Sequence, residues 1–432
     1  MRSSRLPQPS GDGRPRLLVF AYACEPGRGS EPGAGWGLVR ALASIAQCTV
    51  LVGPEHIPAI RRWESAHPES TTTFVEVPEP RWAPAEPRHR FTWFVVYRGW
   101  LTHARRAGLT LHRERPFDGV YHATYSTYWL PTPAVDFGVP CVWGPVGGAV
   151  DTPGPLRPLF GWRGMLTSWL DRVAVRALGT MPASRRTAHK AAAIVVQNNE
   201  TLEALPRRAR SRATILNHAM FVEVAMGARA QRPGRHCVFA GALESRKGAA
   251  LAVRALASAP AHVMLHMIGD GPDRHRLEAL ARQLRVDSRV RFLGRLPREE
   301  VLARISDAAA VVFTGLREEG GLALAEAMAT GAPVVVLAHG GARTIAESTT
   351  DPTRVALVPP ADPATTARRI GRALEWFVDH TSDTRAPMLD TAAAHAQLRH
   401  IVLGAVHPEY LRSVDTQKPS SNDDRVGRSL IA

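Results

Sequence analysis

Two carboxylates eight residues apart, Glu318 and Glu326, carry the clearest chemical signal in this chain. Gly320 and Gly321 lie between them, and Gly331 follows shortly after the second carboxylate. Free backbone N–H groups at a glycine-rich helix start can hold a phosphate, and carboxylates so placed can hydrogen-bond the hydroxyls of a ribose and of a sugar. The residue types and their spacing therefore predict a pocket for a nucleotide-sugar.

The surrounding pattern predicts a strand, a loop, a helix and a second strand. Residues 310–314 are apolar and rich in β-branched side chains, 322–330 have a helical pattern, and 333–337 form the next apolar run. Glu318 then lies in the loop at the carboxyl end of the first strand, and Glu326 lies one turn into the helix. Ligands of parallel α/β sheets bind at that edge. The alternative is an ordinary α/β unit with two solvent-facing glutamates.

Strand-like and helix-like patterns alternate along the 432 residues, which is typical of parallel sheets covered by helices. Two such sets meet near Asn217, so we expect an α/β protein with two Rossmann-like parallel-sheet domains facing each other across a cleft. The expected divisions are a disordered N-terminus at 1–15, a first domain at 16–218, a second domain at 219–378, a helical segment at 379–414 that packs back on the first domain, and a disordered tail at 415–432.

The composition excludes several classes of protein. No apolar run reaches the roughly 18 residues that a membrane span needs, and the four cysteines are scattered without metal-ligand spacing. We therefore expect buried, reduced thiols in a cytoplasmic protein without a metal site. Arginine carries almost all of the net charge of +15, a bias that can reflect genome composition. Because the chain has no helix-turn-helix, zinc-finger or ribonucleoprotein pattern, we expect no nucleic-acid partner.

Two stretches combine basic and aromatic residues. Residues 81–115 hold eight arginines against two glutamates, and residues 157–190 hold six arginines and a lysine against one aspartate; both contain several Phe or Trp residues. Arginine binds anionic headgroups and tryptophan favours the membrane interface. The pattern predicts association with an anionic membrane surface, and a solvated basic face over core aromatics is the alternative.

A glycine-rich segment lies between the first predicted strand, at 16–23, and a helix expected at 36–46. It reads Glu25-Pro-Gly-Arg-Gly-Ser-Glu-Pro-Gly33-Ala-Gly35-Trp. Glycines in such a loop let the backbone approach a ligand at the helix N-terminus. The spacing is not that of the dinucleotide-binding fingerprint, and no acidic residue ends the second strand, which argues against a nicotinamide cofactor.

Taken together, these motifs resemble the retaining glycosyltransferases of the GT-B fold, family 4. The two spaced glutamates and the following Ala-Met-Ala-x-Gly-x-Pro-Val-Val match the second-domain signature of that family, and the Glu25 segment is similar to the opening of a bacterial subgroup. Tyr121-His-Ala-Thr-Tyr and Val142-Trp-Gly-Pro-Val-Gly-Gly fit the same subgroup. The resemblance covers roughly residues 16–375.

The resemblance implies roles for individual residues. Glu318 would orient the donor sugar, Lys247 would stabilise the leaving diphosphate, and His122 would border the sugar, as the three catalytic residues. Glu326 would hold the ribose. The full set of implied donor-binding residues is Gly33, Gly35, Arg246, Gly269, Arg295, Leu296, Gly320, Gly321, Leu322 and Glu326.

Two positions depart from the family pattern. The motif Gly-Arg-Leu-x-x-x-Lys-Gly becomes Gly241-Ala-Leu-Glu-Ser-Arg-Lys-Gly here, so Ala242 replaces an arginine that would contact the diphosphate. Gly320 replaces an aromatic residue. Of the two cations that the family pattern places at the diphosphate, only Lys247 is therefore present. Arg246 is the arginine nearest to Ala242 in the sequence.

The implied activity is transfer of a hexose-type sugar from a nucleotide-sugar to a glycan or lipid-linked acceptor, with retention of configuration and without a metal or cofactor. The implied setting is surface polysaccharide or glycolipid biosynthesis, with the protein peripheral on the inner face of the cytoplasmic membrane. Two alternatives remain: a degenerate, non-catalytic GT-B homologue that acts by binding, and a nucleotide-sugar epimerase on the same fold.

Overall fold

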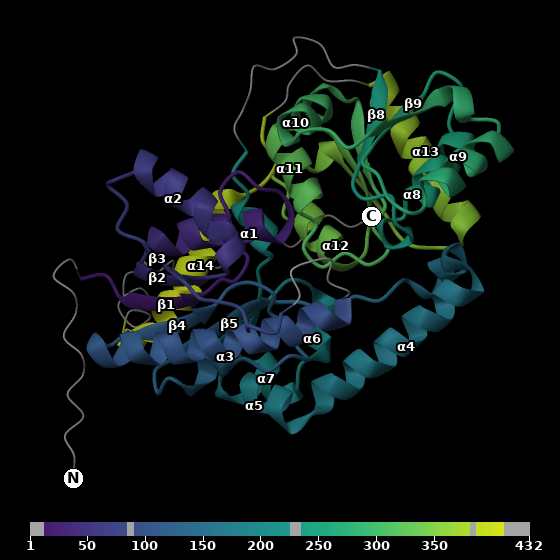
Figure 1. The fold of residues 1–432 in the computed structure, drawn as a ribbon. Helices are drawn as coiled ribbons and strands as arrows, with labels where there is room; N and C mark the ends of the chain where they lie inside the picture. Colours follow the sequence, from purple (N-terminus) through teal and green to yellow (C-terminus); the bar gives the residue numbers. More distant parts are fainter. Residues whose placement is uncertain (1–12, 84–89, 225–234, 381–385, 410–432) are drawn as a thin grey trace, which may run out of the picture.

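The computed structural model describes residues 13–83, 90–224, 235–380 and 386–409. The expected disordered tail at 415–432, and all but the last three residues of the expected N-terminal segment at 1–15, lie outside these ranges. Figure 1 shows two α/β domains side by side, the first coloured purple to teal and the second mainly green. The predicted architecture of two parallel-sheet domains is confirmed.

The first domain contains a seven-stranded sheet in the order β3-β2-β1-β4-β5-β6-β7, with all neighbours parallel. Its strands are β1 (Arg16–Phe20), β2 (Gln47–Val52), β3 (Thr73–Glu76), β4 (Gly119–His122), β5 (Cys141–Val146), β6 (Ala193–Val196) and β7 (Ala213–Ile215). Its helices are α1 (Ser30–Ala43), α2 (Ile57–Ala66), α3 (Arg90–Glu114), α4 (Gly161–Thr180), α5 (Pro182–Lys190), α6 (Asn199–Ala204) and α7 (Arg207–Arg210). The sequence pattern did not predict β3 and β7, because these short edge strands are only partly buried and carry a weak apolar signal.

The second domain contains a six-stranded parallel sheet in the order β10-β9-β8-β11-β12-β13. Its strands are β8 (His236–Ala240), β9 (Met264–Ile268), β10 (Val290–Gly294), β11 (Ala310–Phe313), β12 (Val334–Leu337) and β13 (Val355–Val358). The helices are α8 (Ala249–Ala257), α9 (Arg274–Gln283), α10 (Arg298–Asp307), α11 (Leu322–Thr330), α12 (Gly340–Glu347), α13 (Pro363–Asp379) and α14 (Thr391–Val406). The strand order changes direction between β8 and β11, which is where such sheets open a crevice at their carboxyl ends.

An apolar cluster that contains residues of both domains connects them. The 3-10 helix η4 (His218–Phe221) is buried and contacts both α1 and α11. Helix α14 lies against α1, η4, β5 and β6, with Leu398 and Val402 buried. The last described helix thus returns to the first domain, beneath α1 in Figure 1.

The first helix begins earlier than the sequence predicted. Because α1 starts at Ser30, Gly33 and Gly35 lie within the helix and not in a loop before it. A Cβ on Gly33 would stand 1.9 Å from the carbonyl oxygen of Arg28, and one on Gly35 would stand 2.1 Å from that of Ala23. Both glycines therefore allow α1 to pack directly against the backbone that precedes it.

The aromatic residues of 81–115 do not form the predicted membrane-facing surface. Tyr97 and Trp100 of α3 are buried and pack edge-on against the ring of Tyr22. Trp93 stacks on Tyr97 within the same cluster. These three rings lie in the core of the first domain, whereas Trp82 is exposed.

Helix α4, in the second basic stretch, differs from α3 because it exposes apolar side chains to solvent. It runs along the outside of the molecule, at the lower right in Figure 1. One of its faces exposes apolar side chains at helical spacing: Met165, Leu166, Trp169, Leu170 and Val173. Among the described residues, no helix combines the length and apolar character needed to cross a membrane.

Candidate active site

A cavity of about 450 Å³ opens where the carboxyl ends of β8 and β11 meet the first domain. We call it the β8–β11 cavity. The start of α1, the first residue of η4, and the loops after β8 and β11 supply its walls. Its polar and glycine lining includes Ser30, Glu31, His218, Arg246, Lys247, Arg317, Glu318, Glu319, Gly320, Gly321 and Glu326.

Lys247 and Glu318 meet inside this cavity. Lys247 ends the 3-10 helix η5 (Ser245–Lys247), and its Nζ donates to Oε2 of Glu318 at 2.5 Å. The next residue, Gly248, has a positive φ, and a Cβ there would stand 2.0 Å from the carbonyl oxygen of Thr314. Only glycine lets this turn pack against the end of β11, and the turn places Lys247 at the carboxylate.

The start of α11 completes this contact. Gly321, the N-cap residue of α11, is in the left-handed region with φ of 59°. Its N–H donates to Oε1 of Glu318 at 3.1 Å. The structure thus brings Lys247, Glu318 and the N-terminus of α11 together, with Leu322 also on the cavity wall.

Glu326 lines the same cavity from one turn further along α11. Both Nε and Nη2 of Arg298 donate to its Oε1, at 3.0 and 2.7 Å. Within the described residues no hydrogen bond reaches Oε2. One oxygen of this carboxylate is therefore anchored, and the other is open to a ligand hydroxyl.

His218 occupies the space beside Gly320. A Cβ on Gly320 would lie 2.6 Å from Nε2 of His218, so the aromatic residue of the family pattern has no room here. The same nitrogen is 3.8 Å from Oε2 of Glu31. Neither His218 nor Glu31 was predicted as a site residue from the sequence, although Glu31 lies within the glycine-rich motif.

Ala242 lines the cavity at the position where the resemblance implies an arginine. Two guanidinium groups of the second domain reach the same cavity, from Arg246 and Arg317. Nε of Arg246 donates to Glu244 at 2.7 Å. Arg317 follows β11 by four residues, and no motif pointed to it. Together with Lys247, these arginines give the cavity three cations despite Ala242.

Six predicted site residues do not line this cavity: His122, Gly33, Gly35, Gly269, Arg295 and Leu296. His122 is buried at the end of β4, with its Nε2 2.8 Å from the hydroxyl of Tyr97. Burial lowers the pKa of His122 to about 3, so its ring is neutral near pH 7.

The other three predicted residues outside the cavity belong to the second domain. Gly269 follows β9 and pairs with Gly294, the last residue of β10, and a Cβ on Gly269 would stand 2.0 Å from the carbonyl oxygen of Gly241. Arg295 is exposed. Leu296 packs against the apolar cluster that the two domains share.

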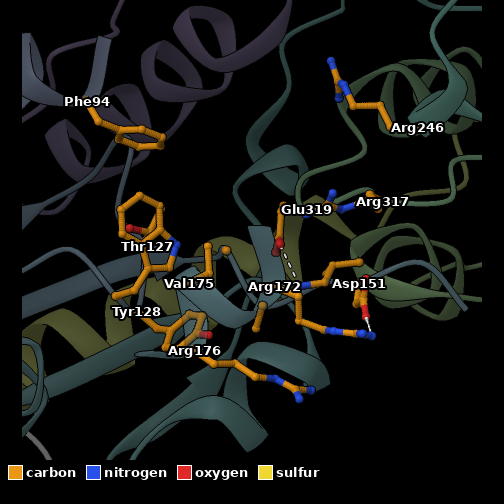
Figure 2. Close-up of a pocket in the computed structure, with 14 residues that line it drawn as sticks. Phe94, Thr127, Tyr128, Asp151, Arg172, Val175, Arg176, Arg246, Arg317 and Glu319 are labelled. Carbon is orange, nitrogen blue, oxygen red and sulfur yellow. Dashed lines mark hydrogen bonds and ion pairs between the residues drawn. The ribbon is translucent and has the colours of Figure 1, made fainter. Parts of the chain in front are cut away.

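A second cavity, of about 430 Å³, adjoins the first and is shown in Figure 2. We call it the α4 cavity because Arg172, Val175 and Arg176 of α4 form one wall. Residues 127–129 and 148–151 of the first domain form another. Both cavities share Arg246, Arg317 and Glu319, so a ligand in one lies next to a ligand in the other.

Glu319 hydrogen-bonds across the domain boundary. Its Oε1 accepts from the Val150 N–H at 2.9 Å and its Oε2 from Nδ2 of Asn198 at 2.9 Å. Its carbonyl oxygen accepts from Nδ2 of Asn217 at 3.1 Å. Burial raises the pKa of the Glu319 carboxyl. The sequence analysis did not identify Glu319, because its neighbour Glu318 accounted for the motif.

No cluster of three or more His, Cys, Asp or Glu side chains suited to a metal ion occurs in the described part of the chain. The charged groups of the two cavities are arginines, one lysine and carboxylates already bonded to N–H donors. This set is suited to anionic, hydroxyl-rich ligands.

Residues 231–376 match the family model described as Glycosyl transferases group 1. A 2-deoxystreptamine glucosyltransferase from Streptomyces kanamyceticus is 31% identical over 140 residues, which are 32% of this chain and 35% of that protein. A D-inositol 3-phosphate glycosyltransferase from Xylanimonas cellulosilytica is 37% identical over 112 residues, 25% of this chain and 27% of that protein. The chain thus matches about a third of the length of these relatives.

Solved structures are similar over nearly the whole chain. HepE from Anabaena in complex with UDP and glucose has a TM-score of 0.51 at 14% identity, covering 93% of this chain and 100% of that one. Sucrose-phosphate synthase from Thermosynechococcus elongatus has a TM-score of 0.53 at 16% identity, covering 94% and 100%. The protein therefore has the GT-B fold, and its residues 231–376 are similar to the Glycosyl transferases group 1 domain.

Proposed function

We propose that this protein is a retaining glycosyltransferase that moves a sugar from a nucleotide-sugar to an acceptor hydroxyl. The contact between Lys247 and Glu318 at the N-terminus of α11, with Glu326 in the same cavity, carries this proposal. Both relatives named above are glycosyltransferases by name, and the HepE structure contains UDP and glucose. They support the same donor class for this chain.

In the proposed reaction the donor diphosphate lies against Lys247 and the first N–H groups of α11. These groups neutralise the charge that develops on the leaving phosphate. Glu318, fixed by Lys247 and Gly321, accepts hydrogen bonds from the sugar, and Oε2 of Glu326 accepts them from the ribose.

The chemical step needs no further group. The acceptor oxygen bonds to the anomeric carbon while the bond from that carbon to the phosphate oxygen breaks. The leaving phosphate oxygen takes the acceptor proton. Because attack and departure occur on the same face of the sugar, the configuration is retained.

The arginines near Ala242 favour an active enzyme over a non-catalytic binding protein. Arg246 and Arg317 supply positive charge in the cavity where the family pattern has its arginine. The adjoining α4 cavity also offers room for a second substrate, which favours sugar transfer over epimerisation, where no acceptor is bound.

The first prediction tests the assignment of Glu326 to the ribose of the nucleotide. We expect Glu326→Ala to weaken binding of the nucleotide by about 1.5–3 kcal/mol, because it removes a charged hydrogen-bond acceptor. A thermal-shift panel of nucleoside diphosphates and their sugars first identifies the ligand, since a ligand of the folded state raises the melting temperature. Calorimetry then compares the wild type with the variant.

Glu300→Ala is the matched control for this experiment. Glu300 pairs with Arg304 on the surface of α10, so its loss should leave nucleotide affinity unchanged. Equal affinity of Glu326→Ala and the wild type would show that the ribose lies elsewhere. If no nucleotide or nucleotide-sugar stabilises the wild type, the proposed function is wrong.

We further propose that the acceptor is a glycan or lipid-linked intermediate of surface polysaccharide or glycolipid synthesis, reached from the inner face of the cytoplasmic membrane. The exposed apolar face of α4 supports this setting. Arg176 is exposed on the neighbouring face of the same helix and adds positive charge beside it, which anionic headgroups attract.

The second prediction tests this membrane contact. Vesicles with anionic lipid should pellet the protein, and salt should weaken the attraction. We expect the triple variant of Leu166, Trp169 and Leu170, each changed to Ser, to remain in the supernatant. Trp376→Ser is the control, because Trp376 is also exposed but lies on α13. Equal pelleting of the triple variant, or equal binding to neutral vesicles, would contradict the proposal.

A further inference from the structure

The α4 cavity has an excess of positive charge. Four guanidinium groups line it, from Arg172, Arg176, Arg246 and Arg317, against two carboxylates, from Asp151 and Glu319. Arg246 also pairs with Glu244, and Arg317 lies 3.9 Å from Asp171. Among the described residues, Arg176 is thus the lining arginine without a carboxylate partner. Figure 2 shows Arg246 and Arg317 on one side of the cavity, Arg172 beside Asp151, and Arg176 beside Tyr128.

The two carboxylates are already occupied. Oδ2 of Asp151 accepts from Arg172 at 2.6 Å and from Arg157 at 3.1 Å. Both oxygens of Glu319 accept hydrogen bonds from the first domain. Arg176, by contrast, is exposed and has no hydrogen bond or ion pair among the described residues. Its charge is therefore available to a ligand.

Aromatic side chains line the opposite side of the cavity. Phe94, Tyr128 and Trp129 contribute to the lining, and the rings of Phe94 and Trp129 meet edge to face with their centroids 4.7 Å apart. In Figure 2 Phe94 and Tyr128 lie across the cavity from Arg246 and Arg317. Flat apolar rings offer a surface for a sugar ring or a hydrocarbon chain.

We propose that the α4 cavity holds the acceptor by a phosphate group, with the sugar or apolar part of the acceptor against these aromatic rings. This inference rests on the proposed function, because it gives the chemical class of the second substrate. The unpaired guanidinium of Arg176, beside three further arginines, suits an anionic group, and guanidinium groups bind phosphate oxygens through paired hydrogen bonds.

The position of the cavity agrees with this assignment. Arg246, Arg317 and Glu319 line both cavities, so a phosphate-bearing acceptor here lies beside the donor. The cavity also continues past Tyr128 and Arg176 into a larger hollow of about 690 Å³. That hollow has room for an acceptor longer than one sugar.

The phosphate group could belong to a soluble sugar phosphate or to a lipid-linked one, and both present the same phosphate group to the arginines. We would titrate the full-length protein by calorimetry with glucose 6-phosphate and with octyl phosphate. Their neutral counterparts are glucose and octyl glucoside. A bound nucleoside diphosphate, from the panel described above, keeps the phosphates out of the β8–β11 cavity.

We expect one phosphate to bind at least tenfold more tightly than its neutral counterpart. Arg176→Gln should weaken that binding at least tenfold and leave nucleotide affinity unchanged, because Arg176 lines the α4 cavity and not the β8–β11 cavity. Arg282→Gln, an exposed arginine on α9, should change neither. Tighter binding of octyl phosphate identifies a lipid-linked acceptor, and tighter binding of glucose 6-phosphate identifies a soluble one.

The proposal is overturned if neither phosphate binds, if each binds no better than its neutral counterpart, or if Arg176→Gln binds phosphate as the wild type does. Failure of the proposed function has a different signature. In that case no nucleotide stabilises the protein. The phosphate titrations are then run without a nucleotide. A loss of phosphate binding in Arg176→Gln still tests whether the α4 cavity binds phosphate.

Discussion

The Lys247→Ala variant is expected to lose sugar transfer by about 10²–10³-fold, the usual cost of removing one charge-stabilising donor from an active site. The ammonium of Lys247 is the cation held directly on Glu318, at 2.5 Å, and within the described ranges the other lysine, Lys190, lies on α5. Donor hydrolysis and transfer by the purified protein would be measured together. Nucleotide affinity should also fall, because the diphosphate loses a partner.

The chain contains its own control for this experiment. It has three lysines, and Lys190 lies on α5, where it pairs with Asp136 away from both cavities. Lys190→Ala should transfer sugar at the wild-type rate. Ala242→Arg should change turnover little if Arg246 and Arg317 already supply the missing charge. If Lys247→Ala still transfers sugar at the wild-type rate, the leaving group binds in another part of the cavity and the assignment of Lys247 is wrong.

Replacing Glu319 with alanine is expected to destabilise the folded protein by roughly 2–6 kcal/mol. The substitution leaves two buried donors, the Val150 N–H and the Asn198 amide, without acceptors, at about 1–3 kcal/mol each. Urea unfolding would measure the loss. Glu347→Ala removes a surface pair with Arg343 and should cost at most about 1 kcal/mol. A similar small cost for Glu319→Ala would contradict the proposed link between the domains.

The Glu319→Gln variant separates charge from geometry. Burial raises the folded-state pKa of Glu319, so the folded protein keeps this proton at a pH where the unfolded chain has lost it. The resulting stabilisation is complete below the unfolded pKa of about 4.3 and disappears as the pH rises through the folded-state pKa. Glutamine cannot titrate. The stability of the wild type relative to Glu319→Gln should therefore decrease as the pH rises across this window.

The strands and helices around the two glutamates could be predicted because their signals are local. The buried strand at 310–313 is wholly apolar, and α11 ends at a glycine with positive φ, as the pattern at Gly331 indicated. The same local signals placed Glu318 at the carboxyl end of β11, and Lys247 lies in the connection that follows the carboxyl end of β8. Those ends are neighbours because β8 and β11 pair in the sheet.

The parts that could not be predicted depend on contacts between distant segments. Arg298 binds Glu326 from 28 residues away, and Glu319 binds Val150 from 169 residues away. No spacing rule connects such pairs. The glycines at 33 and 35 were misplaced for a related reason: their close neighbours are backbone carbonyl groups, which leave no mark in the side-chain sequence.

The return of α14 to the first domain has a consequence for how the protein is made. Leu398 and Val402 fill a surface of α1 and η4 that the rest of the first domain leaves uncovered. A ribosome synthesises the chain from its N-terminus, and domains usually fold in that order. Here the first domain stays incomplete, with apolar surface exposed to solvent, until the second domain has been translated and the last helix has emerged from the exit tunnel.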